Sequence, residues 1–180
     1  MATISEALAE VYASNPEDDF VLNTLEIRHP TFIDDDGNPT AIRVVADHEP
    51  LTAMLEDDAP MNAGQSVRFE AMAFGFALPS TEEGQAPQLS VKLDGVSREA
   101  VGHLENAIGQ TEQIEVTHRR FLAADPAAGP QDGEPLTLYA GVATANLTQV
   151  EMTATLTDVH NKAFPNRIYS PSVFVGLVRG

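Results

Sequence analysis

The chain has 180 residues, enough for one ordinary domain or for two small lobes that share a core. It carries 27 acidic and ten basic residues, a formal charge of −17, and only Lys92 and Lys162 are lysines. This balance excludes binding to nucleic acid through its phosphates and adhesion to an anionic membrane surface. The absence of cysteine excludes disulfides and thiolate metal sites.

Two explanations fit the acidity, and the sequence leaves both open. One is a salty environment, in which ions screen the repulsion over about 8 Å or less. The other is a surface that must not adhere to DNA. The first residues, Met1-Ala2-Thr3-Ile4, contain no basic region followed by an apolar run, so we expect no secretory signal. No apolar run approaches the roughly 20 residues that span a bilayer, so we expect no membrane anchoring.

The chain begins with a predicted helix. Thr3 and Glu6 have the spacing of a capping box, and Asn15-Pro16 ends the segment. Its apolar residues recur at helical spacing and form one stripe: Ile4, Leu8, Val11 and Tyr12. We expect this stripe to pack on the domain or on a neighbouring subunit.

The next third predicts β-structure joined by acidic loops. Residues 20–27 predict a first strand, with Val21, Leu25 and Ile27 on one face, and residues 41–46 predict its partner. The aspartates of the intervening segment 34–39 are consecutive and lack a closing glutamate, which favours a hairpin turn over a calcium loop. A short run at residues 51–55 and one strand over residues 65–76 follow.

Residues 79–87 are rich in Glu, Gly, Pro and Ser and predict a loop, the best internal boundary if there are two lobes (near 79–88). A strand over residues 89–93, a turn at Asp94-Gly95 and a helix capped by Ser97 come next. The helix places its apolar residues on one face and ends at Gly109: Val101, Leu104 and Ile108. Residues 114–121 then predict a strand.

After a Gly/Pro/Asp-rich connection (123–135), residues 136–142 and 150–159 predict a hairpin. In its second strand Met152, Ala154 and Leu156 face inward and a row of threonines faces outward. An apolar run at 173–178 ends the chain. Taken together, the predicted elements favour a mainly β (α+β) fold, an antiparallel β-barrel or sandwich with two short helices. We expect residues 1–180 to form a single domain of this kind.

No motif with recognisable chemistry emerges from these elements. The five histidines are far apart in the chain, and Asp47-His48-Glu49 is best interpreted as a solvated loop because adjacent side chains point apart. There is no glycine-rich phosphate loop and no tryptophan for stacking sugars or bases. We therefore expect no enzymatic activity, no cofactor and no metal.

The sequence resembles a family of tailed-bacteriophage tail proteins, similar to the minor tail protein L (hub) of lambda-like phages. The resemblance follows an N-terminal helix, a Gly-Asn-Pro turn and a set of short runs: Leu25-Glu26-Ile27-Arg28-His29-Pro30, Ala71-Met72-Ala73-Phe74, Leu93-Asp94-Gly95-Val96-Ser97-Arg98-Glu99, Arg119-Arg120-Phe121-Leu122 and Phe164-Pro165-Asn166-Arg167-Ile168-Tyr169. The lambda-type protein has a cysteine-bearing segment associated with an iron–sulfur cluster. This chain has no cysteine, so the cluster is not carried over.

The resemblance implies a ring component at the virion tail tip, synthesised in the bacterial host cytoplasm. Its partners would be copies of itself, as a trimer like the hubs or a hexamer like the distal tail proteins. Other partners would be distal tail, tail tube or tape-measure, and tip or fibre proteins. DNA would pass nearby without specific binding. Alternative functions are a distal tail ring protein, a small-ligand or carbohydrate-binding β-module and, less favoured, a hydrolase.

Two sets of candidate functional residues follow from this interpretation. The first would form interfaces between subunits: Ile4, Leu8, Val11, Tyr12, Phe164, Arg167 and Tyr169. The second would form an acidic channel or surface: Asp18, Asp19, Asp34, Asp35, Asp36, Asp57 and Asp58. If an acidic loop lines the bore, it would repel the phosphates of passing DNA; salt adaptation predicts acid spread over every outer face.

Overall fold

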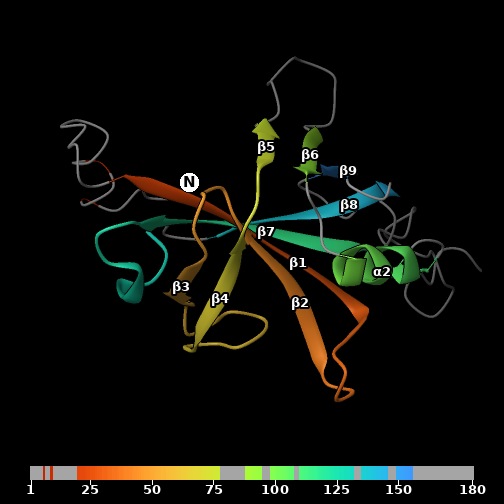
Figure 1. The fold of residues 1–180 in the computed structure, drawn as a ribbon, viewed down its shortest axis with the longest axis horizontal. Helices are drawn as coiled ribbons and strands as arrows, with labels where there is room; N and C mark the ends of the chain where they lie inside the picture. The colour runs from red at the N-terminus through yellow and green to blue at the C-terminus, as the bar shows by residue number, and fades with distance from the viewer. Residues whose placement is uncertain are drawn as a thin grey trace, which may run out of the picture.

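A computed structural model describes residues 20–77, 88–94, 98–107, 110–131, 135–145 and 149–155, together with Glu6 and Ala9. Over these residues the protein is mainly β, with one nine-stranded sheet, one α-helix and one 3₁₀ helix (Figure 1). The predicted fold class is therefore confirmed. Among the described residues, no helix has the length and apolar character needed to cross a membrane.

The elements follow the chain in a simple order. The nine strands are β1 (Val21–Ile33), β2 (Pro39–Val45), β3 (Leu51–Met54), β4 (Ser66–Ala71), β5 (Phe74–Ala77), β6 (Gln88–Asp94), β7 (Ile114–Leu122), β8 (Leu136–Ala145) and β9 (Gln149–Thr155). The helices are α2 (Arg98–Ala107) and the 3₁₀ helix η1 (Pro126–Ala128).

The strands form a sheet in the order β3-β4-β2-β1-β7-β8-β9-β6-β5. Every pairing in it is antiparallel except that of β2 with β4. β4 and β5 lie near opposite ends of this order, yet only Met72 and Ala73 separate them in the chain. The sheet must therefore curl round so that one short connection joins its two ends.

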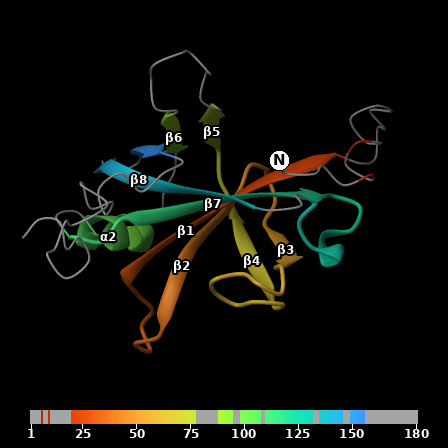
Figure 2. The ribbon, with the colours of Figure 1, turned by 180° about the vertical axis from the view of Figure 1, so that it is seen from behind.

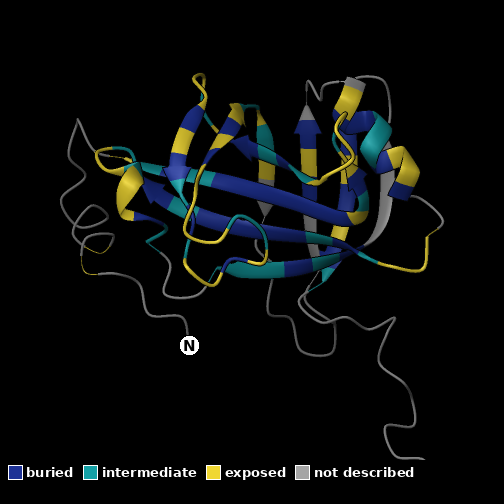
Figure 3. Cartoon of the chain, turned by 90° about the horizontal axis from the view of Figure 1, so that it is seen from below, coloured by how far each residue is buried: buried dark blue, intermediate teal, exposed yellow. Residues whose placement is uncertain are grey.

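Two hydrophobic clusters fill the space on either side of this curled sheet. The larger one takes buried side chains from β1, β2, β6, β7, β8, β9 and α2, including Leu25, Val116 and Leu104. The smaller one gathers Leu22, Val45, Phe69, Phe121 and their neighbours, beneath β3 and β4. The longest strands are consequently buried along most of their length, while exposed residues gather in turns and on the outer side of the helix (Figure 3).

Several predicted elements are confirmed in kind and position. The helix buries Val101 and Leu104, and the β8–β9 hairpin buries Met152 and Ala154 while Thr153 is exposed. β6 and β7 flank α2 but lie three strands apart in the sheet, with antiparallel pairings between. The helix is therefore an excursion from an antiparallel sheet, as its sequence context predicts, and not a parallel crossover.

Other expectations need correction. The first strand does not end at Ile27: it continues to Ile33, with irregular register after Arg28, and spans the molecule (Figures 1 and 2). The single strand predicted over residues 65–76 is two strands, because the chain leaves β4 at Ala71 and pairs with β6 from Phe74. The parallel β2–β4 pairing makes the sheet mixed.

Part of the predicted structure lies outside the described residues. This holds for most of the N-terminal helix, for the C-terminal run at residues 173–178 and for residues 79–87. It also holds for these candidate functional residues: Ile4, Leu8, Val11, Tyr12, Asp18, Asp19, Phe164, Arg167 and Tyr169.

The acidic segment between β1 and β2 is a hairpin turn, as predicted. Oδ1 of Asp34 accepts hydrogen bonds from the backbone N–H groups of Asp36, at 3.0 Å, and Asn38, at 2.8 Å. Gly37 has a φ of +84°, a conformation that glycine adopts without strain. The hydrogen bond from Asn38 is the largest cause that lowers the pKa of Asp34 below its usual 3.8.

This lowered pKa predicts how the turn responds to acid. Because the folded pKa lies below the unfolded one, the turn contributes stability above the unfolded pKa and loses it as the pH falls through the folded pKa. We expect an NMR titration of the Asp34 carboxyl carbon to give a lower pKa in the folded chain than in urea. Equal values in the two states would contradict the hydrogen bonding described here.

Candidate functional site

The second face of β1 carries buried polar and charged residues. Thr24, Glu26 and Arg28 alternate with Leu25 and Ile27, whose side chains belong to the larger hydrophobic cluster. The period of two places the three polar residues on the opposite face of the sheet. All three are buried, so this face is covered by protein.

Glu26 is the centre of a buried ion-pair network. Its side chain is fully buried, and its Oε2 accepts a hydrogen bond of 2.8 Å from Nε of Arg43 on β2. Its Oε1 lies 3.3 Å from Nε of Arg28 and 3.5 Å from Nη1 of Arg119 on β7. One carboxylate therefore faces three guanidinium groups from three adjacent strands. Charges removed from water in this way require partners, because an unpaired buried charge is very costly.

The loop between β3 and β4 (residues 55–65) contributes two further residues to the network, Glu56 and Asn62. Glu56 binds the guanidinium of Arg119 with both oxygens, at 2.8 Å from Nε to Oε2 and 2.6 Å from Nη2 to Oε1. Asn62 accepts a 2.7 Å hydrogen bond from Nη2 of Arg43 through its Oδ1. Asn62 is also the non-glycine residue with positive φ, 56°, among those described. The loop is thus fastened to the sheet at two points, both of them arginines.

Arg28 extends the network toward the surface. Its Nη2 lies 2.9 Å from Oε2 of Glu115, which is 41% exposed, and donates to Oγ1 of Thr117 at 3.3 Å. The network as a whole contains three arginines and three glutamates, so it is formally neutral: Arg28, Arg43, Arg119, Glu26, Glu56 and Glu115. Neutrality and the bidentate Arg119–Glu56 pair reduce the desolvation cost of the buried charges, although Oε1 of Glu26 has ion-pair contacts and no hydrogen bond among the described residues.

A cavity of about 540 Å³ opens beside the network, where Arg28 and Glu115 reach its wall. Its other walls are mostly apolar and come from β1, the loops and β8, including Pro30, Met61 and Tyr139. Oε1 of Gln113, another lining residue, is buried and has no hydrogen-bond partner among the residues that the structure describes. The cavity is large enough for a small ligand and combines a few polar groups with apolar walls, as ligand sites commonly do.

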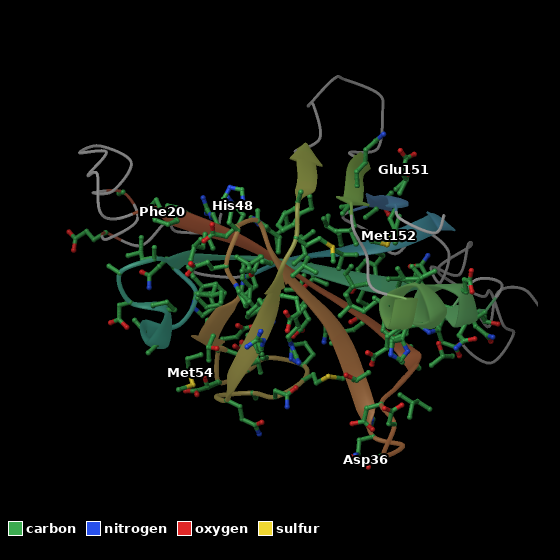
Figure 4. All side chains as sticks on the ribbon, viewed as in Figure 1. Phe20, Asp36, His48, Met54, Glu151 and Met152 are labelled. Carbon is green, nitrogen blue, oxygen red and sulfur yellow. The ribbon has the colours of Figure 1, made fainter. Side chains whose placement is uncertain are left out.

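The described candidate residues of the acidic set lie on two loops. Asp35 and Asp36 are exposed in the β1–β2 turn, and Figure 4 shows Asp36 at its outermost point. Asp57 and Asp58 are exposed in the β3–β4 loop, whereas their neighbour Glu56 turns inward to Arg119. Both loops project to the same side of the molecule, the lower side in Figures 1 and 2.

The histidines that the structure describes do not form a metal site. His48 lies exposed in its loop, as predicted (Figure 4), while His29 and His118 are buried and hydrogen-bonded. Within the described parts of the chain, no three His, Asp or Glu side chains are grouped in a way that would hold a metal ion.

The network itself was not anticipated from the sequence. A signal for it exists, because Glu26 and Arg28 occupy the second face of a strand whose first face is strongly apolar. On a solvated sheet face the same alternation is ordinary, so the pattern alone does not indicate burial. What decides the matter is the covering loop, which contacts the sheet through residues far away in the sequence.

A comparison with known protein families identifies the family of this chain. Residues 7–169 match the family described as a domain of unknown function (DUF1833). The chain belongs to this family. No curated protein matches it. All strands of the sheet, the ion-pair network and the cavity fall inside the matched residues, so they are features of the DUF1833 domain of this chain.

Proposed function

We propose that this chain is a structural component of a bacteriophage tail tip or baseplate, a hub-type ring protein that joins the tail tube to the tip proteins. It would act by assembly around the DNA channel, as a homo-oligomer with other tail proteins, and not as an enzyme. The resemblance to lambda-like tail proteins supports this proposal. A second support is the mainly β domain, in which a neutral ion-pair network connects the adjacent strands β2, β1 and β7.

The observation that carries the proposal is where the arginines lie. Three of the eight arginines are buried in the network, where they pair with three glutamates, and this leaves 24 of the 27 acidic and seven of the ten basic residues outside it. Of these seven, Arg68 and Lys92 are paired with Glu70 and Glu151. Outside the network the sequence therefore has more than three acidic residues for each basic one, a composition that suits a wall past which DNA slides.

Gene deletion tests this proposal directly. Removing the gene from the phage or prophage genome that encodes it should give particles with absent or incomplete tail tips in electron micrographs, and a plasmid copy should restore them. Neighbouring genes for a tape-measure protein and a tail-tip peptidase would agree with this result. Normal, infective particles without the protein would contradict the proposal.

The acidic loops give a sharper prediction. Exchanging Asp57 and Asp58 for lysine should slow DNA ejection from assembled particles, because the new cations would hold passing phosphates. Folding should be nearly unaffected, since exposed charges contribute little to stability. The matched control is the same exchange at Glu49 and Glu105, two exposed acids outside both the β1–β2 turn and the β3–β4 loop. Equal ejection rates for both variants would contradict a role for this loop at the bore.

A second candidate function, a small-ligand-binding β-module, is favoured by one observation, the cavity beside Arg28 and Tyr139. An aromatic ring beside polar groups suits a sugar ring. Neutral monosaccharides should then raise the melting temperature of the purified chain, and the Tyr139→Ala variant should lose this shift. A panel of such sugars without any effect would remove this candidate.

A further inference from the structure

One edge of β2 lacks a partner strand over most of its length. β2 pairs with β1 along residues 41–45, but with β4 only at Val44 and Val45. From Pro39 to Arg43, no strand among the described residues pairs with β2 on the side away from β1. β2 and β4 instead diverge from the centre of the molecule (Figure 1).

The register shows which backbone groups face this open side. The N–H of Ala46 donates to the carbonyl of Asn23, so the even-numbered residues of β2 exchange hydrogen bonds with β1. The odd-numbered residues face away, as the carbonyl of Val45 does when it accepts the N–H of Met72. The N–H groups of Ala41 and Arg43 therefore point toward the space between β2 and the diverging strand β4.

That space is a groove of about 550 Å³. One side is the edge of β2 itself, which contributes residues 40–44. The other sides come from β4, from Met72 and from three residues of α2: Glu99, Ala100 and His103. Because five consecutive residues of β2 line the groove, backbone N–H and C=O groups of the strand edge face it as well as side chains.

Two polar side chains in the walls of the groove, His103 and Glu99, make few interactions within the described part of the chain. Nε2 of His103 is buried without a hydrogen-bond partner there, and the nearest carboxylate oxygen, of Glu99, is 3.9 Å away. Glu99 is 79% exposed, whereas Glu70 is already paired with Arg68. Arg43, which also lines the groove, is engaged by Glu26 on the opposite face of the sheet. The walls of the groove thus include a buried imidazole, the exposed carboxylate of Glu99 and the apolar side chain of Met72.

We propose that this groove binds an extended segment of a partner protein, which pairs with the edge of β2 as an additional strand. An extended backbone supplies N–H and C=O groups at the spacing that a strand edge requires. The segment has apolar residues alternating with lysine or arginine, because Glu99 and the formal charge of −17 attract cations and disfavour a second copy of this chain. The edge accommodates about five residues, or about 16 Å of strand. This proposal is independent of the proposed role in the phage tail tip.

A synthetic peptide of alternating lysine and valine is the probe. Added to the purified full-length chain, it should slow hydrogen exchange at the Ala41 and Arg43 amides and shift their NMR signals. Ala41→Pro, which removes an N–H group that faces the open edge and not β1, should lose the binding. The same peptide with every second amide N-methylated should fail to bind wild-type chain, which tests backbone pairing without altering the protein.

Three results would overturn the proposal. The first is unchanged exchange at Ala41 and Arg43 at millimolar peptide. The second is equal protection by the N-methylated peptide, because the contact would then not be a strand pairing. The third is equal protection by a peptide of alternating glutamate and valine, because the charge of the groove would then not select the partner.

Discussion

The Glu26→Ala variant is expected to lose about 3–5 kcal/mol of folding free energy, the typical cost of removing one partner from a buried ion pair. Glu26 is fully buried and faces Arg28, Arg43 and Arg119. Its removal leaves these three guanidinium groups with two carboxylates of the network, Glu56 and Glu115, to balance their charge. Urea unfolding followed by circular dichroism would measure the change. The largest loss should come from this glutamate because no other carboxylate of the network contacts all three arginines.

A matched control is available on the surface. Glu70→Ala also removes a glutamate from an arginine, Arg68, but both side chains are more than 60% exposed. Water solvates the remaining charge there, so the change should be too small to resolve in the same measurement. If Glu26→Ala were as harmless as Glu70→Ala, the network would not hold the sheet and the β3–β4 loop together.

The Phe69→Ala variant is expected to lose about 3–5 kcal/mol, as is usual when a large aromatic side chain is deleted from a core. Phe69 is fully buried in the smaller cluster, and its ring centroid lies 5.8 Å from that of Phe121 on β7. The deletion removes this ring pair and leaves a space beneath β3 and β4 that rigid strands cannot fill. The free energy of unfolding in urea would again be the readout.

Phe20→Ala serves as the control for this second variant. Phe20 precedes β1 and is 52% exposed, so its truncation removes little surface from the protein interior. A loss for Phe69→Ala no greater than that for Phe20→Ala would mean that the smaller cluster is not a true core. Such a result would also separate β3 and β4 from the cooperative unit.

The local elements could be predicted because their causes are local. Alternation in Leu89-Ser90-Val91-Lys92-Leu93 and the helical spacing of Val101 and Leu104 describe β6 and α2 well. The turn at Asp34 was likewise visible, since Asp, Asn and Gly favour turns through their own hydrogen bonds and backbone freedom. Each of these signals lies within about ten residues of the structure it specifies.

Features that depend on distant partners could not be predicted in this way. Met72-Ala73 contains neither glycine nor proline, so nothing local indicates that the chain changes partner strands there. The burial of Arg119, on the second face of β7, likewise depends on the β3–β4 loop, whose Glu56 binds its guanidinium group. Charged residues in a strand indicate solvent only when no other element covers that face.

The groove beside β2 illustrates the same limit for a candidate site. Its residues come from β2, β4 and α2, which are far apart in the sequence, and none of them forms a motif. The open edge exists because β4 pairs with β2 only through its last two residues, Glu70 and Ala71, whereas residues 66–69 of β4 pair with β3 alone. Only the pairing register makes Ala41 and Arg43 candidates for strand addition.

The most direct test of the central proposal is a cryo-EM map of the intact particle encoded by the same genome. Our account predicts a ring of copies of this chain at the tail tip, between the tail tube and the tip proteins, with the loop of Asp57 and Asp58 or the turn of Asp35 and Asp36 facing the bore. A tail tip without this chain would contradict the proposed function. A ring with all of these aspartates on its outer wall would contradict the DNA-repelling role and favour salt adaptation.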